Sequence, residues 1–141
     1  MIALLIILIV SIAYAVIRAF HDSKISNGKW KTWAFIEGAL ICLVVSILTA
    51  MLFFMRWWMT IPLAMIFAFV FWLVFDCMEG YLRTGNILHL GEYGFDLKMR
   101  KTFYYDKPIL GWRNTGAIRL VLFKCFWIGL WIPAYFSLSN L

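Results

Sequence analysis

Long uncharged stretches alternate with short charged ones along this chain. The uncharged stretches cover residues 1–17, 38–55, 57–75 and 125–141. Each approaches the roughly 17–25 mostly apolar residues that a helix needs to cross the hydrocarbon core of a bilayer. In lipid only helices and closed barrels satisfy their own backbone hydrogen bonds, and the polar alternation of barrel strands is missing from these stretches. The pattern predicts membrane-spanning helices at about 2–20, 34–55, 58–78 and 118–138.

Composition supports the same class. Hydrophobic residues make up 65% of the chain and charged residues only 14%, whereas soluble domains carry about 25% charged residues. No basic residue precedes the first apolar stretch, and Arg18 follows it, so we expect a retained helix rather than a cleaved signal peptide. The sequence therefore predicts an all-α integral membrane protein. It forms a single transmembrane domain, 1–141, with four transmembrane helices and a long cytoplasmic interfacial loop, 79–117, between the third and fourth.

Basic residues indicate the orientation. They concentrate in the connections 21–33 and 79–117, whereas the turn between the second and third helices carries only Arg56. Because short basic loops stay in the cytoplasm, we expect a multi-pass protein of the inner (cytoplasmic) membrane with both termini on the outer side. Anionic lipid head groups are the expected partners on the cytoplasmic side. Nucleic acid is not expected, since no nucleic-acid motif accompanies the basic residues. The residues expected to contact lipid or a partner are Arg83, Lys98, Arg100, Lys101 and Arg113.

On this topology every acid and both histidines lie at or near the cytoplasmic side. The candidate polar cluster consists of His21, Asp22, Glu37, Asp76, Glu79, His89 and Lys124. Glu37 and Lys124 lie inside predicted helices, and ionisable groups at such depth usually face the bundle interior and pair with one another. We expect ion pairs such as Glu37 with Lys124 or Asp76 with Arg119, unless Lys124 extends to the head groups.

The cluster also permits a second interpretation. His21-Asp22 ends the first predicted helix, and Asp76-x-x-Glu79 ends the third, so a divalent cation or acid–base chemistry is conceivable at this interface. However, the Glu-x-x-His pairs of di-iron bundles, H-E-x-x-H and a paired C-x-x-C are all absent. The sequence thus assigns no catalytic residue, no metal ligand and no cofactor. We expect Asp76 to be an inward-facing anchor bonded to residues 21–23 or to amides of 80–96, and Glu79 to face the loop.

The loop from 80 to 116 mixes glycines with aromatic, apolar and basic residues. This composition is typical of a segment in the membrane interface. A short amphipathic helix at about 95–103 and an extended or re-entrant cap are the two alternatives. The functional interpretation is partner or lipid binding, and the structural one is a packed lid.

The stretch FWLVFD at 71–76 is followed by GYLR at 80–83 and ILHLGEYGFD at 87–96. This pattern resembles one in small hypothetical membrane proteins of bacteriophages and prophages, over about residues 71–96, with HDS at 21–23 as a further match. The chain differs from that pattern in having His89 where an aromatic residue is usual, and in a longer tail with a fourth span. The resemblance implies a phage-encoded inner-membrane protein, but it assigns no activity and no functional residues.

Three hypotheses of function follow. The first is a non-enzymatic assembly or interaction component of the inner membrane that associates with itself or with other membrane proteins, since the chain is rich in aromatic residues and lacks a catalytic motif. The alternative is a small interfacial enzyme that acts on lipid head groups or phosphates with a His/carboxylate site, with or without a metal, at the cytoplasmic face. A proton or ion pathway through Glu37 and Lys124 is the third, but ionisable residues are missing from the outer half.

Overall fold

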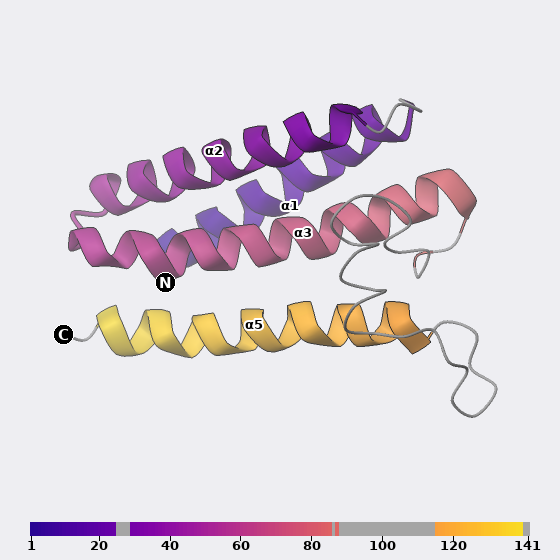
Figure 1. Ribbon diagram of the computed structural model, residues 1–141. Helices are drawn as coiled ribbons and strands as arrows, with labels where there is room; N and C mark the ends of the chain where they lie inside the picture. The colour runs from indigo at the N-terminus through magenta and orange to yellow at the C-terminus, as the bar shows by residue number, and fades with distance from the viewer. Residues whose placement is uncertain (25–28, 86, 88–114, 140–141) are drawn as a thin grey trace.

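The computed structural model describes residues 1–24, 29–85, 87 and 115–139, and this part of the chain is helical without any strand. The side chains of 29–35, 115–117 and 119 lie outside what the structure describes. The elements are α1 (Ile2–Ser23), α2 (Lys29–Leu52), the short 3-10 helix η1 (Trp57–Met59), α3 (Thr60–Thr84) and α5 (Thr115–Ser139), as Figure 1 shows.

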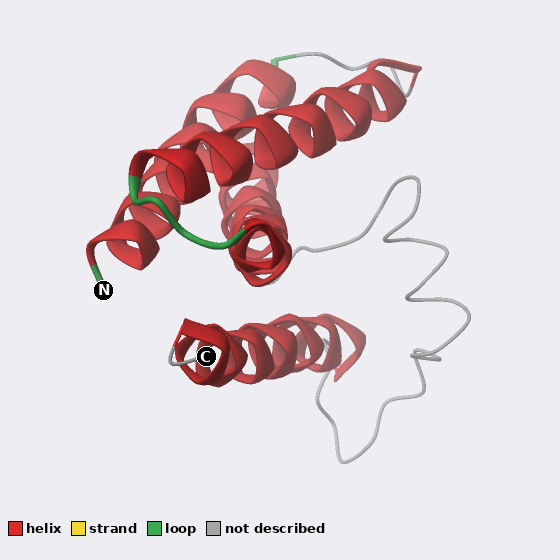
Figure 2. Cartoon of the chain, turned by 90° about the vertical axis from the view of Figure 1, so that its left-hand side faces the viewer, coloured by secondary structure: helices red, strands yellow, loops and turns green. Residues whose placement is uncertain are grey.

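The helix α3 is the centre of the arrangement. It contacts α1, α2 and α5, and α5 lies on the opposite side of α3 from α1 and α2 (Figures 1 and 2). Both chain termini lie at the same end of the molecule as the turn between α2 and α3. The end of α1, the start of α2, the end of α3 and the start of α5 lie at the other end.

The prediction of an all-α fold with long apolar helices is confirmed for the described residues. Three helical stretches are long and apolar enough to cross a membrane, namely Ile2–Ser23, Trp57–Thr84 and Leu120–Ser139. A fourth apolar stretch, Ile36–Leu52, is shorter. By length and composition, the fold therefore contains three candidate spans and one shorter apolar helix.

Small side chains let α1 pack closely on α3. A stripe of residues spaced by four is buried along α1: Ala3, Ile7, Ser11, Ala15 and Ala19. Side chains four apart share one face of a helix, and small residues on that face allow two backbones to approach closely. The hydroxyl of Ser11 donates to the carbonyl of Leu8 at 2.9 Å, so its polar group is satisfied within α1.

The same device appears on α2. Its buried stripe is Gly38, Cys42, Ser46 and Ala50. A Cβ added at Gly38 would lie 3.5 Å from the ring of Phe71 on α3, so the glycine forms the flat surface on which this ring rests. The thiol of Cys42 donates to the carbonyl of Ala64 at 3.1 Å, which adds a polar contact between α2 and α3.

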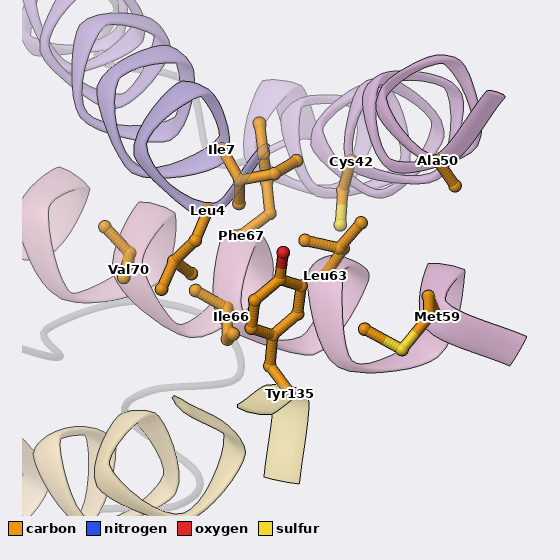
Figure 3. Packing of buried hydrophobic residues seen from close by; sticks show 10 residues of the cluster. All are labelled: Leu4, Ile7, Cys42, Ala50, Met59, Leu63, Ile66, Phe67, Val70 and Tyr135. Carbon is orange, nitrogen blue, oxygen red and sulfur yellow. The ribbon is translucent and has the colours of Figure 1, made fainter. Parts of the chain in front are cut away.

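The core lies around the first half of α3. Figure 3 shows Leu63, Ile66 and Phe67 of α3 surrounded by side chains from the other helices, among them Ile7 of α1 and Tyr135 of α5. All five are at most 2% exposed. Because Tyr135 reaches this core, α5 is part of the same packed unit.

Aromatic side chains continue the packing on both sides of α3. Phe71 stacks on Tyr14 of α1, with 5.2 Å between ring centroids. On the other side of α3, Phe69 stacks on Trp127 of α5, with centroids 5.7 Å apart and planes 4° apart. Ring pairs at such separations contribute beyond the area that they bury. The rings therefore join α3 to a helix on each side.

The end of α3 differs from the prediction. The third helix was expected to end at 78, whereas α3 continues to Thr84, so the predicted start of the long loop at 79 is wrong. The apolar run stops at Phe75, but Glu79 and Arg83 form an i,i+4 ion pair that continues the helix. The helix ends before Gly85, whose φ of 72° suits a glycine after a helix C-terminus.

The other observed helix boundaries lie closer to the predicted ones. The second helix was expected to reach 55, but α2 ends at Leu52 because Phe53 and Phe54 form a turn, with a φ of 50° at Phe54. The amphipathic helix predicted at 95–103 and almost all of the predicted loop beyond 85 lie outside the described residues.

Candidate functional site

The ionisable side chains of the helices gather toward the end where α1 and α3 terminate. They form two groups that we treat separately. The first, called the interhelical polar network, consists of Tyr14, Arg18, His21, Asp22, Glu37, Glu79 and Arg83. The second is the Asp76–Lys124 pair between α3 and α5.

Asp22 is the centre of the polar network. Its side chain is only 6% exposed, and its Oδ1 lies 3.2 Å from Nε of Arg18 and 3.2 Å from Nδ1 of His21. Arg18 precedes Asp22 by one helical turn, so the two side chains meet on one face of α1. The buried carboxylate thereby accepts from Arg18 and lies within hydrogen-bond distance of the imidazole of His21, both on its own helix.

Arg18 extends the network to α2. Its Nη1 lies 3.0 Å from Oε2 of Glu37, and the hydroxyl of Tyr14 donates to Oε1 of the same carboxylate at 3.3 Å. Glu37 is 49% exposed in its side chain, so its attraction to Arg18 is weaker than that of a buried pair. The contact connects α1 and α2 at this end.

Arg83 extends the network to α3. Its Nε lies 2.9 Å from Oε1 of Glu79, one turn earlier in the same helix. Its Nη2 donates to the backbone carbonyl of Asp22 at 2.8 Å. That carbonyl belongs to the last turn of α1, where carbonyls lack the usual intrahelical donor. Arg83 therefore caps α1 and ties it to α3.

The Asp76–Lys124 pair joins α3 to α5. Lys124 is fully buried, Asp76 is 5% exposed, and Nζ of Lys124 donates to Oδ2 of Asp76. The same Nζ lies 4.1 Å from the ring centroid of Trp72, one turn before Asp76, in a cation–π arrangement. Removing one member of a buried pair leaves a charge without a counter-charge, which costs about 3–5 kcal/mol.

The pair lies deep along both helices. Asp76 precedes the last residue of α3 by eight positions, and Lys124 follows the first residue of α5 by nine. At a rise of about 1.5 Å per residue, each group is roughly 12–14 Å from the nearer end of its helix. The two depths match, as expected for antiparallel neighbours.

The structure changes the pairing expected from the sequence. The predicted pair of Glu37 with Lys124 is wrong, because α5 lies across α3 from α2 and the two side chains face different neighbours. The alternative in which Lys124 extends to the head groups is also wrong, since its side chain is fully buried. The expected partner Arg119 of Asp76 has a side chain outside the described residues.

The two carboxylates of α3 agree with the expectation in part. Asp76 is buried, as expected of an inward-facing anchor, and its ion-pair partner is Lys124 of α5, which neither expected pairing assigned to it. Glu79 lies within α3, because the helix continues to Thr84, and its side chain is 11% exposed beside Arg83. Almost all of the loop that Glu79 was expected to face lies outside the described residues.

Several predicted residues cannot be placed. His89 of the candidate cluster lies outside the described residues, and the same is true of Lys98, Arg100, Lys101 and Arg113, which were expected to contact lipid or a partner. Of that second set the structure places Arg83 alone, and it puts this side chain in the polar network.

The arrangement limits the chemistry of the site. Among the residues that the structure describes, no group of three or more His, Cys, Asp and Glu side chains is disposed to hold a metal ion. Within the described helices, the feature suited to proton transfer is His21, whose side chain is 59% exposed. When Nδ1 donates to Asp22, the other ring nitrogen is left as an acceptor, which is how a carboxylate orients an imidazole base.

Three participating residues were missed in the sequence. Tyr14 and Arg18 precede Asp22 by eight and four residues, and Trp72 precedes Asp76 by four. Such spacing places each set on one helix face. This spacing of four or eight from an acid could have identified the three residues in the sequence, because acids are rare in such an apolar chain and residues four apart on a helix are neighbours.

Comparisons with known proteins do not identify the chain. No family model, no curated protein and no solved structure matches it. Proposals about its function therefore depend on the packing of its helices and on the paired charges described above.

Proposed function

We propose that the chain is a non-enzymatic, four-span component of the inner membrane that assembles with itself or with other membrane proteins. In this proposal α1, α2, α3 and α5 each cross the bilayer, with both termini on the outer side. The long α3–α5 connection lies at the cytoplasmic interface, where basic residues face anionic head groups. The resemblance over residues 71–96 supports a phage or prophage origin.

The observation that carries the proposal is the distribution of apolar and charged side chains. Large apolar residues point outward along the helices, for example Ile9 on α1, Leu48 on α2 and Phe126 on α5, all more than half exposed. Buried positions, in contrast, include Asp22, Asp76 and Lys124. A soluble bundle has the opposite distribution, whereas membrane helices expose apolar faces and turn ionisable groups toward one another.

The pairing of the acids supports a structural role for them. Each of the four acids placed by the structure has a cationic partner: Asp22 and Glu37 have Arg18, Asp76 has Lys124, and Glu79 has Arg83. Three of these four ion pairs, all but the one between α3 and α5, meet at the end where α1 and α3 terminate. The Arg18–Glu37 and Asp76–Lys124 pairs and the hydrogen bond from Arg83 to the carbonyl of Asp22 connect different helices. Polar contacts between helices stabilise membrane bundles.

The α2 helix needs a separate argument. Its described apolar stretch is shorter than the other candidate spans. However, α2 has 24 residues, which at about 1.5 Å per residue gives roughly 36 Å, enough for a hydrocarbon core of about 30 Å. Its small-residue stripe faces α3, so α2 would cross as part of the packed unit.

Assembly can be tested by energy transfer in vesicles. Two preparations of the chain, one labelled with a donor and one with an acceptor, are reconstituted together and diluted with increasing amounts of phosphatidylglycerol-containing lipid. We expect energy transfer that persists on dilution and that decreases when unlabelled chain is added. Transfer that falls to the value for randomly mixed labelled lipids would show a monomer and contradict self-assembly. Release of the chain from membranes by alkaline carbonate would contradict the four-span placement itself.

One contact favours a second candidate, an interfacial enzyme that acts on lipid head groups or phosphates. His21 lies against Asp22 at 3.2 Å and is exposed at the expected cytoplasmic interface. Phosphorus NMR of phosphatidylglycerol vesicles that contain the purified chain tests this. A new phosphorus signal that is absent with His21→Ala would favour the enzyme. An unchanged spectrum supports the assembly component.

A further inference from the structure

Lys124 makes α5 difficult to insert into a bilayer by itself. It lies only three residues from the centre of the helix, and Pro133 interrupts the hydrogen bonds of the second half. Among the three stretches long enough to span, the one in α5 is the least apolar. A lysine at such depth is costly in lipid unless it is paired. The helix therefore needs a counter-charge before it can occupy the position that the structure gives it.

The structure shows where that counter-charge comes from. Lys124 donates to Asp76 and lies over the ring of Trp72, so both groups that stabilise its charge belong to α3. The main contacts of α5 are with α3, together with a smaller one with η1. The stacked rings of Phe69 and Trp127 and the buried Tyr135 complete this interface.

We propose that Asp76 is the insertion partner of α5: α5 enters the bilayer docked on α3, with its lysine neutralised by Asp76 and covered by Trp72. Without Asp76, α5 stays at the membrane surface on the side where it begins, and the C-terminus does not reach the side of the N-terminus. This inference depends on the four-span placement proposed above. Beyond that placement, the inference says that α3 carries the surface on which α5 docks. It also says that docking needs the charges of Asp76 and Lys124, 48 residues apart, to pair.

Glu79 provides a matched control. It lies three residues after Asp76 on the same helix, is also buried, and also forms an ion pair. Its partner Arg83 belongs to α3 itself, so loss of the Glu79 charge leaves α5 with its counter-charge. The proposal thus predicts different results for two neighbouring buried acids. If α3 only needed acids at its end in general, the two substitutions would have the same effect.

The experiment uses the full chain with its three cysteines replaced by alanine and a reporter cysteine introduced by Ser139→Cys. Cells or spheroplasts are treated with a membrane-impermeant maleimide before and after permeabilisation. A second reporter, Phe54→Cys, is placed at the α2–α3 turn, where Phe54 is 96% exposed. The variants are Asp76→Asn, Asp76→Asn with Lys124→Met, the exchange Asp76→Lys with Lys124→Asp, and Glu79→Gln.

In the parent and in Glu79→Gln, we expect Ser139→Cys to react from the side of the N-terminus. In Asp76→Asn the fraction that reacts from this side should fall roughly fivefold or more, because Lys124 is left without a counter-charge. Replacing Lys124 with methionine should restore it, and the charge exchange should restore it at least in part. Phe54→Cys should react equally in all variants, which shows that α1, α2 and α3 keep their places.

Three results would overturn the proposal. The first is unchanged labelling of Ser139→Cys in Asp76→Asn, and the second is failure of Lys124→Met to restore it. The third is a parallel loss of labelling at Phe54→Cys, which would show that Asp76 holds the whole bundle. If the parent itself did not react at Ser139→Cys from the side of the N-terminus, the four-span placement would fail as well.

Discussion

The carboxylates of Asp22 and Glu37 face the same guanidinium from different surroundings. Asp22 is nearly inaccessible and bonds both Arg18 and His21, whereas half of the Glu37 side chain is exposed. The contribution of an ion pair to stability depends more on burial than on the distance between its charges. An exposed pair is screened by water and gains little, whereas a buried charge that loses its partner cannot be solvated. The two acids should therefore respond differently to truncation.

We predict that Asp22→Ala lowers the free energy of unfolding by about 1–3 kcal/mol, since it removes the buried partner of Arg18 and leaves only the half-exposed Glu37 beside it. Glu37→Ala should lower it by less than about 1 kcal/mol. Unfolding by SDS in mixed micelles, followed by circular dichroism, measures both. Tyr14→Phe is the control, because it removes one hydrogen bond to Glu37 and no charge. An equal loss for Asp22→Ala and Glu37→Ala would contradict this ranking.

Sequence reasoning identified most ionisable residues of the site but not their partners. Asp76 and Lys124 stood out because each interrupts or limits an apolar run. Which charges meet depends on which helices are neighbours, and the apolar pattern carries no information on that. The wrong pair of Glu37 with Lys124 has this cause, since α5 packs on α3 and away from α2 (Figure 2). Arg18 was missed for another reason, because its spacing of four from Asp22 on α1 was not used.

At the scale of elements, the helices were predictable and their contact faces were not. The four apolar stretches predicted the rough limits of α1, α2, α3 and α5, with the largest error at the end of α3. The packing faces of α1 and α2 consist mostly of small residues at every fourth position, and hydrophobicity does not distinguish these from residues that face outward. A search for small residues at this spacing would have found Ala15 on α1 and Gly38 on α2.

The stripe on α1 gives a prediction at this scale. Ala15 is fully buried, so Ala15→Leu should force α1 away from its neighbours and lower the free energy of unfolding by about 1–3 kcal/mol through overpacking. Ile17→Leu, two positions on at a site that is 67% exposed, should change it little. SDS unfolding of both variants measures the difference. Equal stability of Ala15→Leu and the parent would show that the stripe is not a tight contact.

The glycine of the α2 stripe gives a second prediction. A Cβ at Gly38 would lie 3.5 Å from the Phe71 ring, an ordinary contact, so Gly38→Ala should be tolerated or stabilise the helix by up to about 1 kcal/mol. Gly38→Leu has no such room and should destabilise. Gly129 of α5 is the control, because a Cβ there meets nothing within 4 Å, and both substitutions should be accepted at that position. A tolerated Gly38→Leu would contradict the close contact of α2 with α3.

At the scale of the whole molecule, the arrangement of helix ends follows from the alternating directions of α1, α2, α3 and α5. Both termini and the α2–α3 turn lie at one end, and the polar network lies near the other. The basic residues add a further prediction, that the end with the termini faces outward, and this orientation stays a prediction. Whether the two ends of the molecule lie on opposite sides of a membrane depends on α2, because its apolar stretch is the shortest of the four.

We predict that reporter cysteines separate into two groups in the cysteine-free chain. Phe54→Cys and Ser139→Cys should react with an impermeant maleimide from one side of the membrane, and Lys24→Cys, in the exposed residue after α1, only from the other. Denatured protein, in which all three must react, is the control for reagent access. If α2 lies on the surface instead of crossing, Lys24→Cys and Phe54→Cys share a side, because α2 is the only helix between them. That single result would reduce the spans from four to three and place the two termini on opposite sides of the membrane, with the polar network still holding α1 to α3.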